Sequence, residues 1–197
     1  TETKSSAASD VFKRQVSKLV DQSFRVSRIV SNLRAVVRDS ADSRMVLDMA
    51  TVAVRAAQDA ARSLGAEDRL EVSEAGEPVM VWGSVGPLEL AVGNLVRNAI
   101  EASPPDGVVR FSVEGGTDWA EIRVEDSGPG VSEEIVDKVF EPFFTTKTER
   151  GGTGLGLAIT RDMIAQLGGE LGLDNSEHGG ACATIRLQRW QETEPSS

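Results

Sequence analysis

Hydrophobic residues recur at alternating spacings of four and three between Asp10 and Arg38, and only Ser23 interrupts the series. The series consists of Phe12, Val16, Leu19, Val26, Val30, Leu33 and Val37. One narrow apolar seam along nearly 30 residues is typical of a helix that packs against a partner helix. We predict a coiled-coil-type helix over residues 10–40, with an ordinary amphipathic surface helix as the alternative. The polar ends, 1–9 and 191–197, are predicted to be disordered tails.

The pattern changes after residue 42, where helical and strand periodicities intermingle. Helical spacing predicts helices over 45–64, 85–103, 132–140 and 155–167. The segments "RLEVSEAG" and "VMVWGS" predict a β-hairpin, and four strands are predicted in "VVRFSVEGG", "WAEIRVEDSG", 170–174 and 181–187. We therefore predict an α+β domain over 42–190. It is a two-layer α/β sandwich with a mixed, mostly antiparallel sheet and helices on one face, preceded by the long helix.

Composition narrows the functional classes. The formal net charge is −10, which argues against nucleic acid and direct membrane contact as partners. The single histidine, His178, argues against a histidine-based zinc site, and the single cysteine, Cys182, is predicted to be a small buried side chain in a strand. The chain contains no apolar run of 18 residues and opens with no signal peptide. A cytoplasmic location is expected, and the parent protein could still be membrane-anchored.

The segment "NLVRNAIEA" places Asn94 and Asn98 one helical turn apart on the same face. Asparagine is a mediocre helix former, so two asparagines inside a good helix indicate that their carboxamides have a functional role. A carboxamide oxygen is a hard ligand that suits Mg²⁺, which completes its shell with phosphates and water. Plain solvent exposure is the alternative.

Two glycine-containing segments offer room for a ligand. In "EDSGPGV", Asp126 ends a strand and can accept a hydrogen bond from an exocyclic amine, while Gly128 and Gly130 leave space for a flat base. A capped turn is the alternative. In "GGTGLGL" (151–157) the glycines precede a helix whose free N–H groups attract anions. A flexible loop with a helix cap is the alternative there.

Between these two segments lies "FEPFFTTKTERGG" (140–152), which holds three of the chain's six phenylalanines. Exposed aromatic side chains in a loop usually pack against another surface. Lys147 and the threonine hydroxyls of this loop can reach phosphate oxygens if the loop closes over a nucleotide.

The four motifs, in this order, resemble the N, G1, F and G2 boxes of the ATP-binding catalytic domain of two-component sensor histidine kinases, nearest the oxygen- and nitrogen-sensing branch. The resemblance covers about residues 42–188 and implies ATP and Mg²⁺ as cofactors, with Asn98 as the metal ligand. It implies adenine binding by Asp126, Gly128 and Gly130, with Thr184 in support. The remaining nucleotide contacts that it implies are Asn94, Thr146, Lys147, Gly152, Thr153, Gly154, Leu155 and Gly156.

The same resemblance implies that the γ-phosphoryl group passes to a histidine on a dimerisation hairpin and then to a response regulator receiver domain. The helix over 10–40 is similar to the second helix of that hairpin. No histidine precedes it, and His178 falls in a predicted turn between two strands. We expect the acceptor to lie on a helix outside these 197 residues, so the chain alone should not phosphorylate itself.

Three rival functions come from the same nucleotide-binding superfamily. In gyrase-type and chaperone ATPases a glutamate usually stands four residues before the metal-binding asparagine, where this chain has Asn94. An ATPase is therefore the weaker hypothesis, although Glu101 complicates it. A serine kinase of the anti-sigma type lacks a dimerisation hairpin, which the heptad helix argues against. A pseudokinase scaffold fits poorly with intact glycines, Asn98 and Asp126.

Overall fold

The computed structural model describes residues 44–73, 76–146 and 153–191. The helix predicted over 10–40 and the tail over 1–9 lie outside the described residues, and of the tail predicted over 191–197 only Gln191 is described. The described elements are β1 (Met45–Asp48), α2 (Met49–Ser63), η2 (Glu67–Arg69), β2 (Leu70–Ser73), β3 (Met80–Gly83), α3 (Val85–Ala102), β4 (Val109–Gly115), β5 (Trp119–Glu125), η3 (Lys138–Phe140), α4 (Gly156–Gln166), β6 (Glu170–Asn175) and β7 (Ala181–Gln188). None of the described helices is both long and apolar enough to cross a lipid bilayer.

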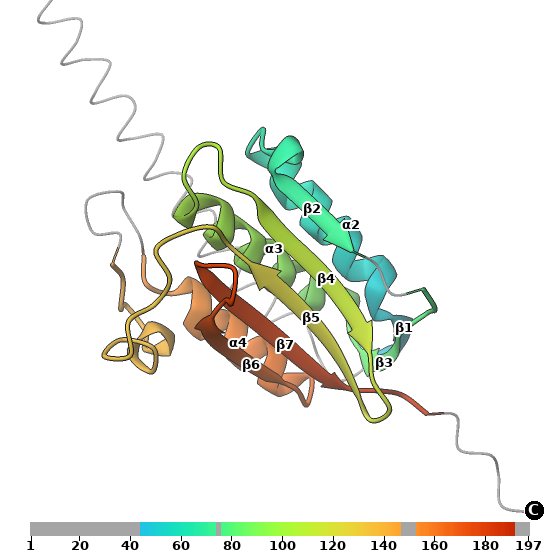
Figure 1. Cartoon of the computed structure of the whole chain (residues 1–197). Coiled ribbons are helices and arrows are strands. Elements are labelled where there is room, and N and C mark those ends of the chain that lie inside the picture. The colour runs from blue at the N-terminus through green and yellow to red at the C-terminus, as the bar shows by residue number, and fades with distance from the viewer. Residues whose placement is uncertain (1–43, 74–75, 147–152, 192–197) are drawn as a thin grey trace, which may run out of the picture. The chain divides into compact units, whose positions relative to one another are not determined.

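Five strands form the main sheet, in the order β2-β4-β5-β7-β6. Only β2 and β4 run parallel, and the other neighbouring strands are antiparallel. Helices α2, α3 and α4 cover one face of this sheet (Figure 1). The predicted two-layer α/β sandwich, with its mixed and mostly antiparallel sheet, is confirmed. The remaining strands, β1 and β3, form a separate antiparallel pair.

The hairpin predicted from "RLEVSEAG" and "VMVWGS" is wrong, because β2 and β3 pair with other strands. β2 joins the edge of the main sheet beside β4, and β3 pairs with β1. Arg69 explains the first pairing, since its guanidinium donates to the carbonyls of Gly107 (2.9 Å) and Pro104 (2.9 Å) in the α3–β4 loop. These long-range bonds hold the start of β2 next to β4, and a local turn signal cannot reveal them.

Two predicted helices also need correction. Residues 45–48 are the strand β1 and not the first turn of a helix, because Asp48 caps α2 and the helix begins at Met49. Residues 132–140 form turns that end in the single 3₁₀ turn η3 in place of a regular helix. The helices predicted over 85–103 and 155–167 are confirmed as α3 and α4 with small boundary shifts.

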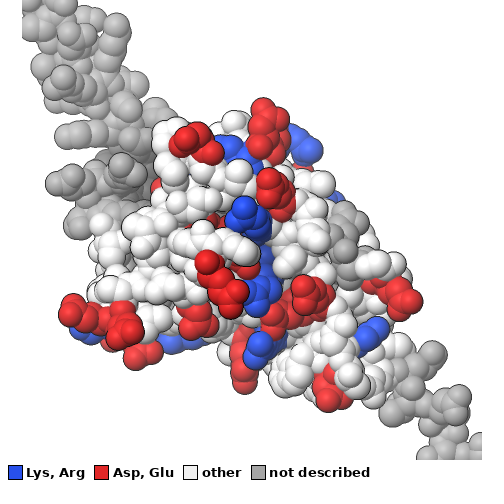
Figure 2. Space-filling view, viewed as in Figure 1, with Lys and Arg blue, Asp and Glu red and all other residues white. Residues whose placement is uncertain are grey.

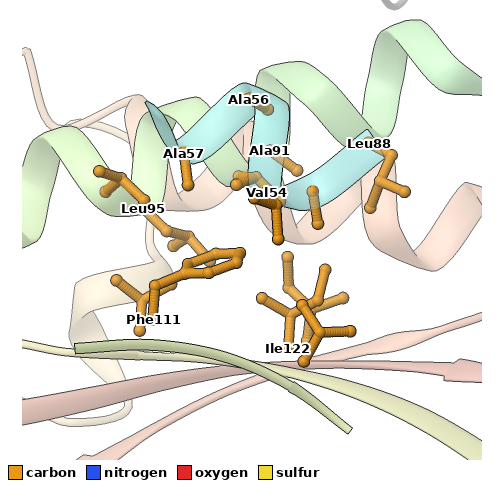
Figure 3. Packing of buried hydrophobic residues seen from close by; sticks show 14 of the residues in the cluster. Val54, Ala56, Ala57, Leu88, Ala91, Leu95, Phe111 and Ile122 are labelled. Atoms are coloured by element: carbon orange, nitrogen blue, oxygen red, sulfur yellow. The ribbon is translucent and has the colours of Figure 1, made fainter. Parts of the chain in front are cut away.

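The core lies between the helices and the sheet. Alanines dominate the buried side of α2, which lets it approach α3 closely, and α3 contributes Leu88, Ala91 and Leu95. In Figure 3 these side chains point toward Phe111 of β4 and Ile122 of β5. Burying a large apolar side chain contributes about 1.5–3 kcal/mol. This packing fixes the rotation of α3 about its axis and therefore the direction of its polar residues.

The opposite face of the sheet carries charged side chains (Figure 2). Arg123 of β5 forms ion pairs with Glu121 (3.5 Å) and Glu125 (3.3 Å), and Arg186 of β7 bonds Glu121 at 2.6 Å. Cys182 of β7 is buried, and that burial raises the pKa of its thiol. The prediction of a small buried cysteine in a strand is confirmed.

Asp48 ties β1, α2 and β3 together, and its replacement by alanine should destabilise the domain. Burial acts to raise the pKa of Asp48, but hydrogen bonds from the Thr51 hydroxyl and from the N–H groups of Val79 (2.9 Å) and Ala50 (3.2 Å) outweigh it, and the pKa lies below its usual 3.8. Asp48→Ala should lower the free energy of unfolding by about 1–2 kcal/mol at neutral pH, as for other helix caps.

The free energy of unfolding, measured in urea at neutral pH and again below pH 3.8, checks this prediction. Because the folded-state pKa is depressed, the stabilisation by the charged carboxylate is fully present above the ordinary pKa and is lost as pH falls through the folded-state pKa. The difference in unfolding free energy between the wild-type chain and Asp48→Ala should therefore shrink as the pH falls below the ordinary pKa of 3.8. A difference that is the same at both pH values would contradict a role for the charge.

Candidate functional site

Asn94 and Asn98 lie on one flank of α3, between its buried face and solvent. The neighbours Leu95 and Ala99 are buried in the core, and both asparagines are half-buried. Four residues correspond to about one helical turn, so the two carboxamides lie one above the other. The side chain of Asn98 makes no hydrogen bond with the part of the chain that the structure describes. Its amide oxygen is available to a ligand.

Asn94 is held against the start of α4. Its Nδ2 donates to the hydroxyl oxygen of Thr160 (2.8 Å), and that hydroxyl donates to the carbonyl of Gly156 (2.9 Å). A Cβ at Gly156 would lie 3.0 Å from the Asn94 carboxamide, so the absence of a side chain there permits the close approach. The asparagine motif (94–102) and the glycine motif (151–157) are therefore in direct contact.

The turn after β5 is organised by the Asp126 carboxylate. Its Oδ1 accepts hydrogen bonds from the N–H groups of Gly128 (2.8 Å) and Ala181 (3.1 Å), and the Asp126 N–H donates to the Ala181 carbonyl (2.9 Å). Among the described residues, Oδ2 has no hydrogen-bond donor. One carboxylate oxygen thus shapes the turn, and the other is left to accept from a ligand.

The glycines of this turn are required by close contacts. A Cβ at Gly128 would lie 2.8 Å from the Ala102 carbonyl oxygen at the end of α3. Gly130 has φ of 76°, and a Cβ there would lie 2.5 Å from the Asn175 side chain. The Asn175 carboxamide also bonds the N–H (2.7 Å) and the carbonyl (2.9 Å) of Val131. The turn is consequently fixed between α3 and the end of β6.

Two serines fasten the same turn to the end of α3. The Ser127 N–H donates to the Ser103 hydroxyl oxygen (3.0 Å), and that hydroxyl donates to the Ala99 carbonyl (2.9 Å). The Ser127 hydroxyl donates to the Val108 carbonyl (2.6 Å). The C-terminal end of α3 therefore contacts the turn at residues 126–131, called the acidic turn below. Asn94, earlier in α3, contacts the start of α4.

The aromatic loop contacts the glycine motif through its backbone. The Phe143 N–H donates to the Gly154 carbonyl (2.9 Å), and Gly154 has φ of 65° with no room for a Cβ, which would lie 2.3 Å from Phe143. Phe143 is 75% exposed, and the guanidinium of Arg161 lies 5.4 Å above the Phe140 ring. Thr146 is exposed, and Lys147 and Gly152 lie outside the described residues.

The first turn of α4 has the features of an anion site. No side chain caps this helix, and Leu155 occupies the N-cap position, with its N–H 3.4 Å from the Thr153 hydroxyl. The N–H groups of an uncapped first turn and the helix dipole favour phosphate oxygens. Thr153, Gly154, Leu155 and Gly156 are half-buried and lie at this helix start, and their phosphate contacts stay a prediction.

Thr184 does not reach Asp126. It pairs in register with Arg123 of β5 and Gly172 of β6, and its hydroxyl lies 3.7 Å from the Cys182 sulfur. The β7 group that donates to the Asp126 carboxylate is the backbone N–H of Ala181 (3.1 Å). The strand register places Thr184 three residues along β7 from Ala181, and its support of adenine binding stays a prediction.

Several residues at this site were not found from the sequence. They make contacts through hydroxyls, one amide and the backbone, which leave no distinctive motif; they are Ser103, Ser127, Thr160, Asn175, Gly180 and Ala181. The available signals were a threonine one turn into the glycine-motif helix and the paired glycines before β7. His178 is exposed in the β6–β7 turn, as predicted.

Two other observations concern ligand sites. Within the described ranges, no three His, Cys, Asp or Glu side chains gather in a way that could hold a metal ion. A shallow hollow lies at the β4–β5 turn and contains none of the predicted site residues; it is lined by Gly115, Gly116, Thr117, Arg189, Trp190 and Gln191.

Comparison with known proteins identifies the arrangement. Residues 83–191 match the family described as histidine kinase-, DNA gyrase B- and HSP90-like ATPase. The chain belongs to this ATPase family. It is 32% identical over 190 residues to the two-component sensor PprA of Pseudomonas aeruginosa, covering 90% of this chain and 20% of PprA. It is 35% identical over 179 residues to the histidine-protein kinase AfsQ2 of Streptomyces coelicolor, covering 86% of this chain and 32% of AfsQ2.

Solved structures place the domain within this family. The mycobacterial sensor histidine kinase MprB is 30% identical with a TM-score of 0.64, covering 74% of this chain and 97% of the MprB chain. The catalytic domain of the histidine kinase ThkA is 28% identical with a TM-score of 0.65, at the same coverage. The domain is therefore a histidine kinase catalytic domain of the ATP-using family, and the chain spans less than two fifths of the length of the sensor kinases PprA and AfsQ2.

Proposed function

We propose that this domain binds ATP with Mg²⁺ and transfers the γ-phosphoryl group to a histidine on a dimerisation helix outside these 197 residues, for relay to a response regulator receiver domain. The observation that carries the proposal is the convergence of three motifs on α3. Asn94 touches the start of α4, and the turn that holds Asp126 is bonded to the C-terminal end of the same helix. A nucleotide spanning these elements would meet a base acceptor, metal ligands and phosphate donors in one place.

The roles of the residues follow from their free atoms. Oδ2 of Asp126, which accepts no hydrogen bond from the described residues, would accept one from the adenine amino group, with Gly128 and Gly130 beside the base. The uncapped first turn of α4 would donate its N–H groups to the phosphates. Thr146, Lys147 and Gly152 are proposed to complete the phosphate contacts from the adjoining loop. Phosphoryl transfer needs this positioning more than it needs covalent chemistry by the protein.

The donor set fits Mg²⁺. The half-buried Asn98 carboxamide has no hydrogen-bond partner among the described residues, and the Asn94 amide spends its nitrogen on Thr160, which leaves its oxygen. Neutral amide oxygens together with nucleotide phosphates suit a hard cation that keeps few protein ligands. When bound, Mg²⁺ would neutralise charge on the phosphates. Asn98 is the proposed ligand, and Asn94 is proposed to support the metal or the phosphates.

Net ATP hydrolysis is not favoured. The related proteins PprA and AfsQ2 are sensor kinases, and the position that would carry a water-activating base is the amide of Asn94, which cannot accept a proton at neutral pH. Glu101 lies at the exposed C-terminal end of α3. A serine kinase of the same superfamily has no observation in its favour here.

The proposal is tested with γ-labelled ATP and the purified chain. The chain alone should bind a fluorescent ATP analogue in a saturable, Mg²⁺-sensitive way and should acquire no label. Adding in trans a dimerisation hairpin that carries the acceptor histidine should yield acid-labile label on the hairpin. An Asn98→Ala variant serves as the negative control and should transfer no label. Label on the chain itself that disappears in His178→Gln would contradict the assignment of the acceptor.

A further inference from the structure

Thr160 is a fully buried polar residue that contacts Asn94 and no other residue of the asparagine helix through a hydrogen bond. It lies one turn into α4 with 0% of its surface exposed, and its hydroxyl group contacts two partners. Threonine is a poor helix former, and its hydroxyl needs hydrogen-bond partners when it is buried. Its position opposite α3 therefore calls for an explanation beyond helix formation.

The hydrogen-bond inventory of the hydroxyl determines how Asn94 is oriented. A hydroxyl group has one proton, and Thr160 donates that proton back to the carbonyl of Gly156 at 2.9 Å. The hydroxyl oxygen can then only accept, so the Asn94 atom that lies 2.8 Å away must be the amine nitrogen Nδ2. The amide oxygen of Asn94 is thereby turned away from Thr160.

A rotated Asn94 amide would be chemically different toward a nucleotide. With Nδ2 directed outward, the carboxamide would offer a hydrogen-bond donor and no ligand to a cation. With Oδ1 directed outward, it offers the oxygen that Mg²⁺ requires. Residues that hydrogen-bond to a metal-ligating side chain commonly set its orientation, and their loss lowers metal affinity.

We propose that Thr160 is a positioning residue, which holds the Asn94 carboxamide so that its oxygen serves the Mg²⁺–phosphate end of the nucleotide. The inference deepens the proposed function and rests on it. It predicts that the Thr160 hydroxyl matters for the metal-dependent part of nucleotide affinity and matters little for the affinity of metal-free ATP.

The test compares Thr160→Val with Thr160→Ser in the full 197-residue chain. Valine keeps the shape of threonine and removes the hydroxyl, and serine keeps the hydroxyl. A fluorescent ATP analogue is titrated with Mg²⁺ and again with EDTA. Thr160→Val should raise the Kd measured with Mg²⁺ by about tenfold and leave the Kd measured with EDTA nearly unchanged. Thr160→Ser should keep both Kd values close to those of the wild-type chain.

Ile164→Val is the matched control, because Ile164 is also fully buried on α4 and contacts neither Asn94 nor the nucleotide motifs through any hydrogen bond. It should lower the melting temperature and leave the ratio of the two Kd values unchanged. The proposal would be overturned if Thr160→Val had the same ratio of the two Kd values as the wild-type chain. It would also be overturned if Thr160→Ser changed that ratio as much as Thr160→Val does.

A second readout needs no nucleotide. The side-chain amide protons of Asn94, assigned by their absence in Asn94→Asp, should exchange slowly with solvent in the wild-type and Thr160→Ser chains and quickly in Thr160→Val. Equally fast exchange in the wild-type chain would contradict the hydrogen bond on which the inference depends. Because this readout is independent of ATP, slow exchange in a chain that fails to bind ATP would defeat the proposed function and leave the amide orientation standing.

Discussion

Replacement of Asp126 by asparagine is expected to weaken ATP binding by roughly 10- to 100-fold, the range for a hydrogen bond to a charged group, while leaving the fold almost unchanged. The asparagine Oδ1 can still accept from the N–H groups of Gly128 and Ala181, which the aspartate Oδ1 does in the native turn. The other oxygen becomes an amine, which faces the adenine amino group donor to donor. Binding is measured by calorimetric titration and stability by urea unfolding.

Two comparisons sharpen this experiment. Inosine triphosphate carries a carbonyl in place of the adenine amine, so Asp126→Asn should lose much less affinity for it than for ATP. Asp174→Asn, at an exposed carboxylate of β6, is the matched control and should bind both nucleotides as the wild-type chain does. Unchanged ATP affinity in Asp126→Asn would remove the acidic turn from the binding site.

Replacement of Gly180 by alanine should cause the largest loss of stability among the glycine substitutions outside the nucleotide motifs. Gly180 has φ of 80°, and a Cβ there would lie 2.0 Å from the Asp126 carbonyl oxygen. A left-handed backbone costs an L-residue about 1–2 kcal/mol and overpacking costs about 1–3 kcal/mol more. The free energy of unfolding should fall by about 2–5 kcal/mol in total.

The neighbouring glycines separate these two causes. Gly179 has φ of 86° with open space around it, so Gly179→Ala should show the backbone cost alone. Gly172 has open space and no left-handed backbone, so Gly172→Ala should be neutral or slightly stabilising. If Gly180→Ala loses no more stability than Gly179→Ala in urea unfolding, the close contact with Asp126 is not a constraint on the native fold.

The sequence predicted those parts of the domain that depend on local periodicity. The apolar spacing of 85–103 and the alternation of the strands around β4 and β5 correspond to α3 and the centre of the sheet. The partners of β2 and β3 could not be predicted, because long-range contacts decide them. Arg69 reaches carbonyls more than 30 residues away, and Asp48 bonds the N–H of Val79.

The candidate site divides in the same way. Residues whose chemistry is visible in their type, such as Asn98 and Asp126, were predicted from motifs and from the family resemblance. Residues that act through a buried hydroxyl or through backbone contacts were missed, because Thr160 and Ala181 have no type-specific signature. The motif pattern also could not show that the backbone of Ala181, three positions before Thr184 on β7, bonds Asp126.

The proposed function requires one nucleotide to bridge Asn94 and Asn98 on α3, the turn at Asp126 and the start of α4. Hydrogen exchange of the chain with and without Mg²⁺–ATP tests it most directly. Residues 94–99, 126–131 and 154–159 should gain protection together, with no change at the hollow formed by 115–117 and 189–191. Protection confined to that hollow, or to one of the three segments alone, would contradict the shared site.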